Sequence, residues 1–402
     1  MRWLAGGALF VLLATANGAG YRYGVSDQAF YIPAVTRILD PAAFPRDAPL
    51  IDAQGTLIVT DEVLALATRL TGLSLEVLFF LAYLCALALL WTALVLIGRA
   101  TYASPWLIAA LGAAVTLRHQ IPRTSVNSLE PYFHPRMLAF AVGALAVAAL
   151  LRRRFGIATF LVGAAALVHV TTAMWFAVLL GVAMMTLDRR WRRAGLWIGC
   201  AAILGAVITA LGPARASFTP MDDEWLQAVV AKDSLFASQW PAWVWLANLG
   251  LLALLAGIHH RRRRHGDARA EETALLWGAA ALVALFLLTL PAVVARLALP
   301  VQLQASRIFW LVDFLATIYL IALARRERTA MVLAMALVAV SAARGIYIMT
   351  IERPERALFA IRLEQSPWHD AMAWIRRQPL DTHVLADPGH AWRYGKIGRA
   401  HV

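Results

Sequence analysis

Charged side chains that could carry out group-transfer chemistry gather in a few short polar stretches of an otherwise apolar chain. Asp27 lies in the sequence SDQAFY, a few residues after the first apolar segment. A carboxylate there could deprotonate an acceptor hydroxyl or hold a divalent metal ion. The alternative is structural: Ser26 caps a short helix, and Asp27 is a first-turn acid that the helix dipole stabilises. Both interpretations stay open at this stage.

A second polar stretch, RHQIPRTSVNSLEPYFHPRMLAF, is dense in ionisable groups: Arg118, Arg123, Glu130, His134 and Arg136. Its arginines could bind a phosphate in bidentate fashion, and Glu130 with His134 could supply metal ligands or an acid–base pair. Pro131 and Pro135 oppose the helix that would place those two side chains on one face. The alternative is an interfacial loop whose aromatic residues lie at headgroup depth while its arginines meet lipid phosphate.

Two further residues extend the set of candidates. His169 lies in LVHVTTAMW, at a turn between two short apolar segments, and is either a helix cap or another acid–base or metal-binding group. Arg307 borders a short polar segment, where it forms either a phosphate clamp or an interfacial side chain that snorkels. Asp313 lies inside the following apolar segment and therefore needs a partner, for which Arg307 and Arg344 are the candidates.

The composition indicates what kind of scaffold must position these groups. The chain has 402 residues, of which 61% are hydrophobic and 15% charged, with a mean hydropathy of +0.65. These values predict an all-α polytopic membrane protein. The net charge of +13 comes from arginine clusters between apolar segments rather than from a continuous basic stripe, so we expect no nucleic-acid partner. Cys85 and Cys200 both lie inside apolar segments, which excludes a disulfide framework.

Counting apolar segments gives about eleven transmembrane helices. The expected helices cover residues 3–19, 74–97, 105–117, 137–151, 157–168, 172–187, 196–211, 243–258, 273–294, 308–324 and 330–349. The first could also be a cleaved signal peptide, but a retained helix would tether the loop that follows. Several segments are shorter than the ~20 residues that a simple crossing needs, and the pair around His169 could be one re-entrant hairpin.

The arginine clusters predict the orientation of these helices. They occupy residues 152–154, 189–193, 261–264 and 325–328, and an even number of apolar segments separates each from the next. Because cytoplasmic loops collect basic residues, all four are expected on the cytoplasmic side. The amino terminus is then cytoplasmic, the carboxy terminus is extracytoplasmic, and residues 20–73 form a long first extracytoplasmic loop. The preference for arginine over lysine suggests a GC-rich bacterial genome, and hence the bacterial inner membrane.

Residues 1–350 are therefore expected to form the transmembrane domain, and residues 351–395 the start of an extracytoplasmic αβ segment. Trp368, Met372, Trp374 and Ile375 follow a helical period, and the strand-like sequence THVLADPG comes next. This segment stops sooner than a complete domain would. The last seven residues, KIGRAHV, match the translation of a common sequencing adapter, so residues 396–402 are expected to be an artefactual end of a truncated gene.

Taken together, these features resemble the C-type glycosyltransferase superfold of enzymes that use polyprenyl-phosphate-linked sugars. The matching positions are Asp27 in SDQAFY, the interfacial stretch that runs to Asp47, and the arginine-rich outer loops. The motifs DPAAFPRD, LEPYFHPRMLAF and HVTTAMWF are in addition similar to those of a group of bacterial membrane proteins of this shape. The resemblance covers most of the chain but is architectural, so it supplies a prior for function and no more.

The resemblance implies that Asp27 is the catalytic base or a carboxylate beside a divalent metal ion. It implies further that arginines such as Arg118, Arg123 or Arg307 hold the lipid phosphate of a polyprenyl-phosphate-linked donor. The other expected partners are the membrane lipids themselves. Gln28 follows Asp27 where many members carry a second acid, which puts metal dependence in question. The expected activity is sugar transfer to an extracytoplasmic acceptor; the alternatives are a lipid or solute transporter or flippase, and a non-catalytic membrane scaffold.

Overall fold

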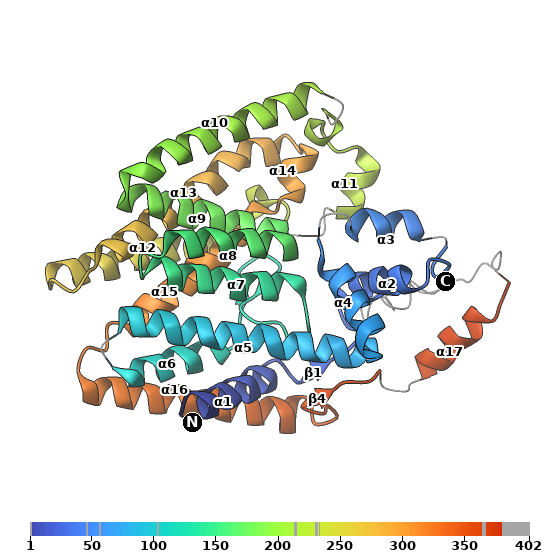
Figure 1. Ribbon diagram of the computed structural model, residues 1–402, viewed down its shortest axis with the longest axis horizontal. Coiled ribbons are helices and arrows are strands. Elements are labelled where there is room, and N and C mark those ends of the chain that lie inside the picture. Colours follow the sequence, from blue (N-terminus) through green and yellow to red (C-terminus); the bar gives the residue numbers. More distant parts are fainter. Residues whose placement is uncertain are drawn as a thin grey trace.

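The computed structural model describes residues 2–45, 47–55, 58–102, 104–212, 215–229, 232, 234–363 and 367–379. Each of the eleven apolar segments forms a helix, and these helices pack into one elongated bundle (Figure 1). They are α1 (Arg2–Asn17), α5 (Leu75–Thr101), α6 (Pro105–Thr116), α7 (Pro135–Leu150), α8 (Phe155–Val168), α9 (Val170–Leu187), α10 (Arg189–Leu211), α12 (Ala242–Arg264), α13 (Ala270–Val294), α15 (Ile308–Ile321) and α16 (Glu327–Tyr347).

Six helical segments of the described chain are long and apolar enough to cross a membrane. They are Leu75–Thr101, Val170–Leu187, Ala242–Arg264, Ala270–Val294, Ala298–Ile321 and Glu327–Glu352. Four more apolar helices, namely α1, α6, α7 and α8, are shorter. The predicted helical class and the membrane character are therefore confirmed.

Helix α7 lies at the centre of the bundle, and nearly all of its side chains are buried. Phe140 stacks on Trp310 of α15 with ring centroids 3.9 Å apart, and it meets Phe176 of α9 edge-on at 5.6 Å. One turn further on, Gly143 leaves room for the ring of Phe176, which any larger residue would displace. This packing fixes α7 against its neighbours, so the residues at its amino-terminal end are held in place.

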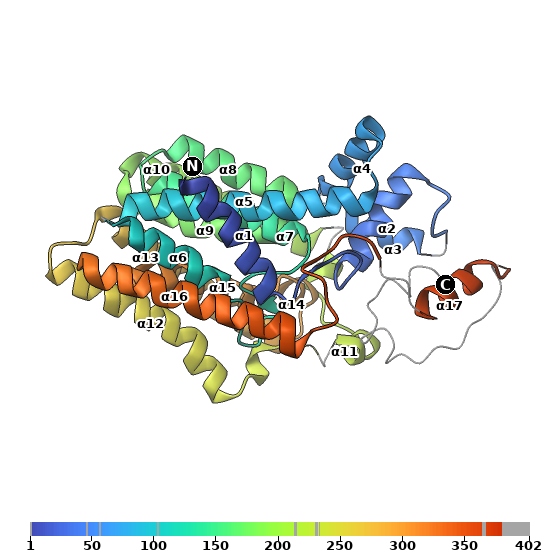
Figure 2. The same ribbon diagram turned by 90° about the horizontal axis from the view of Figure 1, so that it is seen from below.

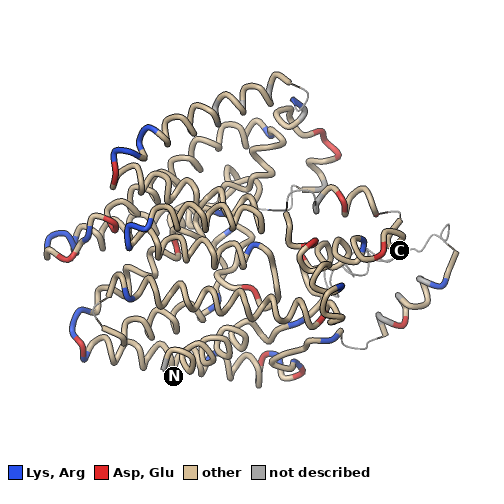
Figure 3. The backbone as a smooth tube through the Cα atoms, in the orientation of Figure 1, with Lys and Arg blue, Asp and Glu red and all other residues tan. Residues whose placement is uncertain are grey.

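The four arginine clusters lie at one end of the bundle, which we call the basic end (Figure 3). Arg153 pairs with Glu271 at the start of α13, and Arg325 pairs with Asp267 at 3.0 Å. Phe155 meets Trp191 with ring centroids 6.4 Å apart, which joins the second cluster to the first. Contacts of the described residues therefore link all four clusters. The sequence predicted that these clusters share one side of the membrane.

The opposite end of the bundle, which we call the site end, carries three helices of the first loop: α2 (Gln28–Leu39), α3 (Ala48–Gly55) and α4 (Thr60–Thr71). They lie beside the end of α5 that is away from the basic end (Figure 1, Figure 2). The sequence predicted a cap at Ser26 for the first of these helices; the observed capping residue of α2 is Asp27, and that of α4 is Val59. Pro33 is accommodated inside α2.

Short elements complete the described fold. Strand β1 (Tyr21–Arg22) pairs in parallel with β4 (Phe359–Ala360), which ties the first loop to the chain after α16. Strands β2 (Gln120–Ile121) and β3 (Val126–Asn127) form a hairpin before α7. The remaining helices are η1 (Arg215–Phe218), α11 (Asp223–Val229), η2 (Ala237–Gln239), α14 (Ala298–Gln302), η3 (Ala305–Arg307), η4 (Ile348–Glu352) and α17 (Pro367–Arg376).

Helix α17 confirms the helix that the sequence predicts after residue 366. The strand-like THVLADPG and the expected artefactual end at residues 396–402 lie outside the described residues.

Candidate functional site

Four segments far apart in the sequence meet at the site end and bring ionisable side chains together. They are the start of α2, the loop before α7 with the first turn of that helix, the junction of α8 and α9, and the end of η3. We call the following residues the site cluster: Asp27, Tyr31, Glu130, His134, Arg136, His169 and Arg307.

His134 is the capping residue of α7, and this position determines its tautomer. Its Nδ1 accepts a hydrogen bond from the backbone N–H of Arg136 at 3.0 Å. The ring proton is therefore on Nε2, which donates to Oδ2 of Asp27 at 3.1 Å. Burial, with a smaller contribution from Arg136, lowers the pKa of His134 to about 4. His134 is thus a neutral donor that supports an ionised Asp27, whose side chain remains 36% exposed.

His169 caps α9 in the same way. Its Nδ1 accepts from the backbone N–H of Thr172 at 3.2 Å, so its proton also lies on Nε2. Its ring centroid is 6.2 Å from that of His134. Burial is the main reason that the pKa of His169 falls to about 3, and the nearby His134 and Arg136 add to the effect. Both histidines therefore present a neutral N–H at ordinary pH.

Arg136 pairs with a buried carboxylate of the site cluster. Its Nη2 donates to Oε1 of Glu130 at 3.1 Å, and the Asn127 amide also donates to that carboxylate. Arg136 and Glu130 are both buried, with 4% of each side chain exposed. The predicted pairing of Glu130 with His134 does not form among these contacts, since Glu130 binds Arg136 and His134 binds Asp27. Glu130 therefore positions a guanidinium.

Arg307 stands out because its charge has no close partner. Within the described part of the chain its guanidinium forms no hydrogen bond and no ion pair, and its Nε is a buried donor without an acceptor. The Nε of Arg136 is likewise buried and unsatisfied. The two guanidinium groups interact electrostatically with each other and with Asp27. The chemistry of two coupled guanidinium groups with buried, unused Nε–H donors matches that of an anion with several acceptor oxygens.

The other two predicted phosphate-binding arginines, Arg118 and Arg123, are not members of the site cluster. Arg118 reaches the site cluster through Glu130, with Nη2 3.8 Å from Oε2, while its Nε donates to the carbonyl of Leu129 at 2.9 Å. Arg123 lies in the turn between β2 and β3, where its backbone is left-handed with φ of 54°. The structure therefore brings Arg136 and Arg307 together and leaves Arg118 and Arg123 in other positions.

Sequence reasoning missed Tyr31 and assigned no structural role to Gln28. The ring of Tyr31 lies 5.3 Å from that of His134, and Tyr31 interacts electrostatically with Asp27, Arg136 and Arg307. Gln28, the residue noted above for standing beside Asp27 in place of a second acid, is fully buried. Its Oε1 accepts from the backbone N–H of Gly24 at 2.7 Å and its Nε2 donates to the carbonyl of Phe133 at 3.0 Å. Gln28 thus ties the loop that carries Asp27 to the residue before His134.

The observed partner of Asp313 is neither of the two arginines that the sequence suggested. Its Oδ2 lies 3.1 Å from Nε2 of His119, and Arg344 instead donates to Oδ1 of Asn17 at 3.0 Å. The sequence-based choice between Arg307 and Arg344 was therefore wrong. This leaves Arg307 available at the site cluster.

Among the described residues, no group of three or more His, Cys, Asp or Glu side chains is arranged to hold a metal ion. The carboxylate of Asp27 pairs with the imidazole of His134, and the carboxylate of Glu130 pairs with Arg136 and Asn127. Comparison of the chain with protein-family models, with curated proteins and with solved structures finds no match. The functional argument therefore rests on the geometry of this site.

Proposed function

We propose that this protein is a membrane glycosyltransferase that moves a sugar from a polyprenyl-phosphate carrier to a hydroxyl group of an extracytoplasmic acceptor. One observation carries the proposal: a partly exposed carboxylate, Asp27, with a neutral histidine behind it, shares a cluster with two guanidinium groups that have unused donors. A base beside an anion site is what transfer from a phosphate leaving group requires.

In the proposed reaction the acceptor oxygen attacks the anomeric carbon of the sugar while Asp27 takes the acceptor proton. The bond between that carbon and the phosphate oxygen breaks, and its electron pair stays on the phosphate. The leaving polyprenyl phosphate thereby gains one negative charge. Arg136 and Arg307 lie where they would stabilise that charge, and His169 offers a neutral N–H beside them.

The proposal includes a position in the bacterial inner membrane with about eleven spans. We place the basic end in the cytoplasm, because four arginine clusters gather there. The amino terminus is then cytoplasmic, and the site end faces the extracytoplasmic side, where polyprenyl-phosphate donors would be used. The shorter helices would cross as tilted or inner helices of the bundle.

The test is transfer by membranes that contain the Asp27→Asn variant. The donors are decaprenyl phosphates that carry radiolabelled glucose, mannose or arabinose, and the label is followed into non-lipid product. We expect the variant to lose at least ~1000-fold in rate, the upper part of the range for loss of a general base. Asp52→Asn is the control, since Asp52 is an exposed acid of the same loop that pairs with Arg37 at 2.9 Å.

Unchanged transfer by Asp27→Asn would overturn the role of Asp27. A lipid flippase would use the arginine pair but not a base, so it would move labelled donor across a vesicle membrane without releasing the sugar from phosphate. Wild-type membranes that transfer no sugar from the whole panel would exclude the proposed activity.

A further inference from the structure

The start of helix α4 is hydrogen-bonded to the end of α8, close in sequence to His169 of the site cluster. The backbone N–H of Val59 donates to the carbonyl of Leu167 in the last turn of α8 at 2.9 Å, two residues before His169. The helix begins at the next residue, Thr60, followed by Asp61. Its first turn is therefore anchored next to the junction that carries His169.

Both side chains of this turn are buried and lack partners. Thr60 is 6% exposed and Asp61 2% exposed, and within the described chain neither Oγ1 of Thr60 nor Oδ1 of Asp61 has a hydrogen-bond partner. Buried polar atoms in native proteins nearly always have one. Two adjacent oxygens without partners point to a ligand that supplies the hydrogen-bond donors.

Tyr31 relates this pair to the site cluster. It interacts electrostatically with Asp61 as well as with Asp27, Arg136 and Arg307, so Asp61 is electrostatically coupled to the same tyrosine as the proposed reaction centre. The two sets of groups differ in chemistry. Arg136 and Arg307 supply unused donors, whereas Thr60 and Asp61 supply unused oxygens.

Retaining Asp61 in this place is unfavourable for folding. Burial, together with the neighbouring Glu62, raises the pKa of Asp61 to about 7. A carboxyl group that is harder to ionise in the folded protein than in the unfolded chain lowers stability as the pH rises from about 4 towards 7. No hydrogen bond to Oδ1 offsets this cost. A buried ionisable group without such compensation is typical of a binding site.

We propose that Thr60 and Asp61 form a hydroxyl-binding subsite for the sugar of the lipid-linked donor, while Arg136 and Arg307 hold its phosphate. This inference rests on the proposed function and extends it, since it assigns the two ends of the donor to two sets of groups that are both coupled electrostatically to Tyr31. The ligand of the new subsite is a polyhydroxylated group whose O–H donors meet the two oxygens. A site built this way discriminates against a ligand that lacks hydroxyls, because its own buried groups would then stay unsatisfied.

The experiment compares binding of two probes to the full chain in lipid nanodiscs. One probe is decaprenyl phosphate, and the other is decaprenyl phosphate that carries glucose, mannose or arabinose, whichever of the three the wild type binds most tightly. We expect Asp61→Ala to weaken binding of the sugar-bearing probe by ~10- to 100-fold, and binding of the bare phosphate by less than ~2-fold. Thr60→Val, which keeps the shape of the side chain, should give a smaller loss in the same direction.

Glu62→Ala is the matched control, because Glu62 is an exposed acid on the same helical turn. It should change neither affinity. Thermal unfolding of the free protein is recorded for each variant, and Asp61→Ala is expected not to lower the midpoint, since it removes a buried group without a partner at Oδ1.

The outcomes separate this inference from the proposed function. If Asp61→Ala weakened both probes equally, weakened neither, or lowered the midpoint of unfolding, the subsite would be overturned. A wild type that bound the sugar-bearing probes no more tightly than bare decaprenyl phosphate would overturn it as well. In each of these cases the wild type would still bind decaprenyl phosphate; if it did not, the proposed function itself would fail.

Discussion

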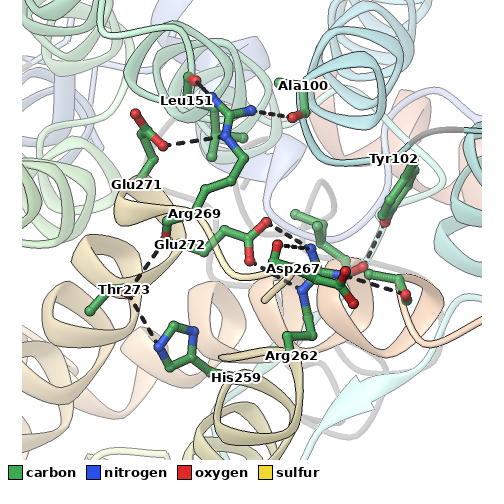
Figure 4. Close-up of polar contacts among 12 residues, drawn as sticks. Ala100, Tyr102, Leu151, His259, Arg262, Asp267, Arg269, Glu271, Glu272 and Thr273 are labelled. Atoms are coloured by element: carbon green, nitrogen blue, oxygen red, sulfur yellow. Dashed lines mark hydrogen bonds and ion pairs between the residues drawn. The ribbon is translucent and has the colours of Figure 1, made fainter. Parts of the chain in front are cut away.

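The two ends of the bundle use the same residue types in opposite ways. At the basic end Arg262 and Glu272 form a bidentate pair, with nitrogen–oxygen distances of 3.1 and 3.0 Å, and Arg262 also donates to the carbonyl of Asp267 at 3.2 Å. Arg269 reaches Glu271 and the carbonyls of Ala100 and Leu151, as Figure 4 shows. At the site end the Arg307 guanidinium forms no hydrogen bond within the described chain.

This difference separates guanidinium groups that have protein partners from one that has no hydrogen-bond partner among the described residues. The guanidinium groups of Arg262 and Arg269 tie helix ends to one another and have carboxylate and carbonyl partners. Arg307 has only an unfavourable neighbour, Arg136, and electrostatic attraction from acids it does not touch. Removing one partner of an ion pair at the basic end should therefore lower the free energy of unfolding. Removing a charged group at the site end should instead weaken ligand binding.

The largest effect on stability is expected from Arg262→Ala. It would leave Glu272, whose side chain is 1% exposed, as a buried carboxylate without its bidentate partner. Breaking one side of a buried ion pair costs about 3 to 5 kcal/mol of folding free energy. Unfolding of the purified protein by denaturant measures this, with Arg263→Ala, an exposed neighbour, as the control. A loss below about 1 kcal/mol would contradict the structural role of the basic end.

A smaller effect, on binding rather than folding, is expected from Arg307→Gln. Loss of charge-assisted hydrogen bonds should weaken the affinity for decaprenyl phosphate by ~10- to 100-fold. Stability should not fall, because the variant removes a buried cation without a close partner. Arg296→Gln, at an exposed arginine before the same polar segment, is the control for both measurements. If Arg307→Gln destabilised the protein as strongly as Arg262→Ala, the contrast between the two ends would be lost.

The smallest effect concerns acid sensitivity at the site end. Burial lowers the pKa of His169 to about 3, below the value of about 6.5 that an unfolded chain gives it. Its contribution to stability is therefore complete above pH 6.5 and declines as the pH falls towards the folded value. Between pH 6.5 and 4.5 the wild type should lose ~1 to 2 kcal/mol more folding free energy than the His169→Gln variant loses. His260→Gln, at an exposed histidine of the basic end, should leave that loss unchanged.

Much of the scaffold could be predicted from the sequence. Eleven apolar segments became eleven helices, and four arginine clusters lie at one end of the bundle. Hydropathy and helix boundaries depend on residues that are neighbours in the chain, so a single sequence carries this information. The positions of the candidate groups could be predicted in part. Asp27, His134, His169 and Arg307 all come from connections between apolar segments, and these connections lie at the site end.

Only the tertiary structure decided how those groups combine. His134 binds Asp27, 107 residues away, because the packing of α7 directs its capping residue towards α2. The burial of Asp61 and the missing hydrogen-bond partner of its Oδ1 could be seen only in the folded protein. Whether a buried charge is satisfied depends on side chains that converge from distant helices, and no local pattern of residue types specifies that convergence. The sequence therefore determined the helices and the end of the bundle on which the chemistry lies, and the packing of the helices determined which partners each group has.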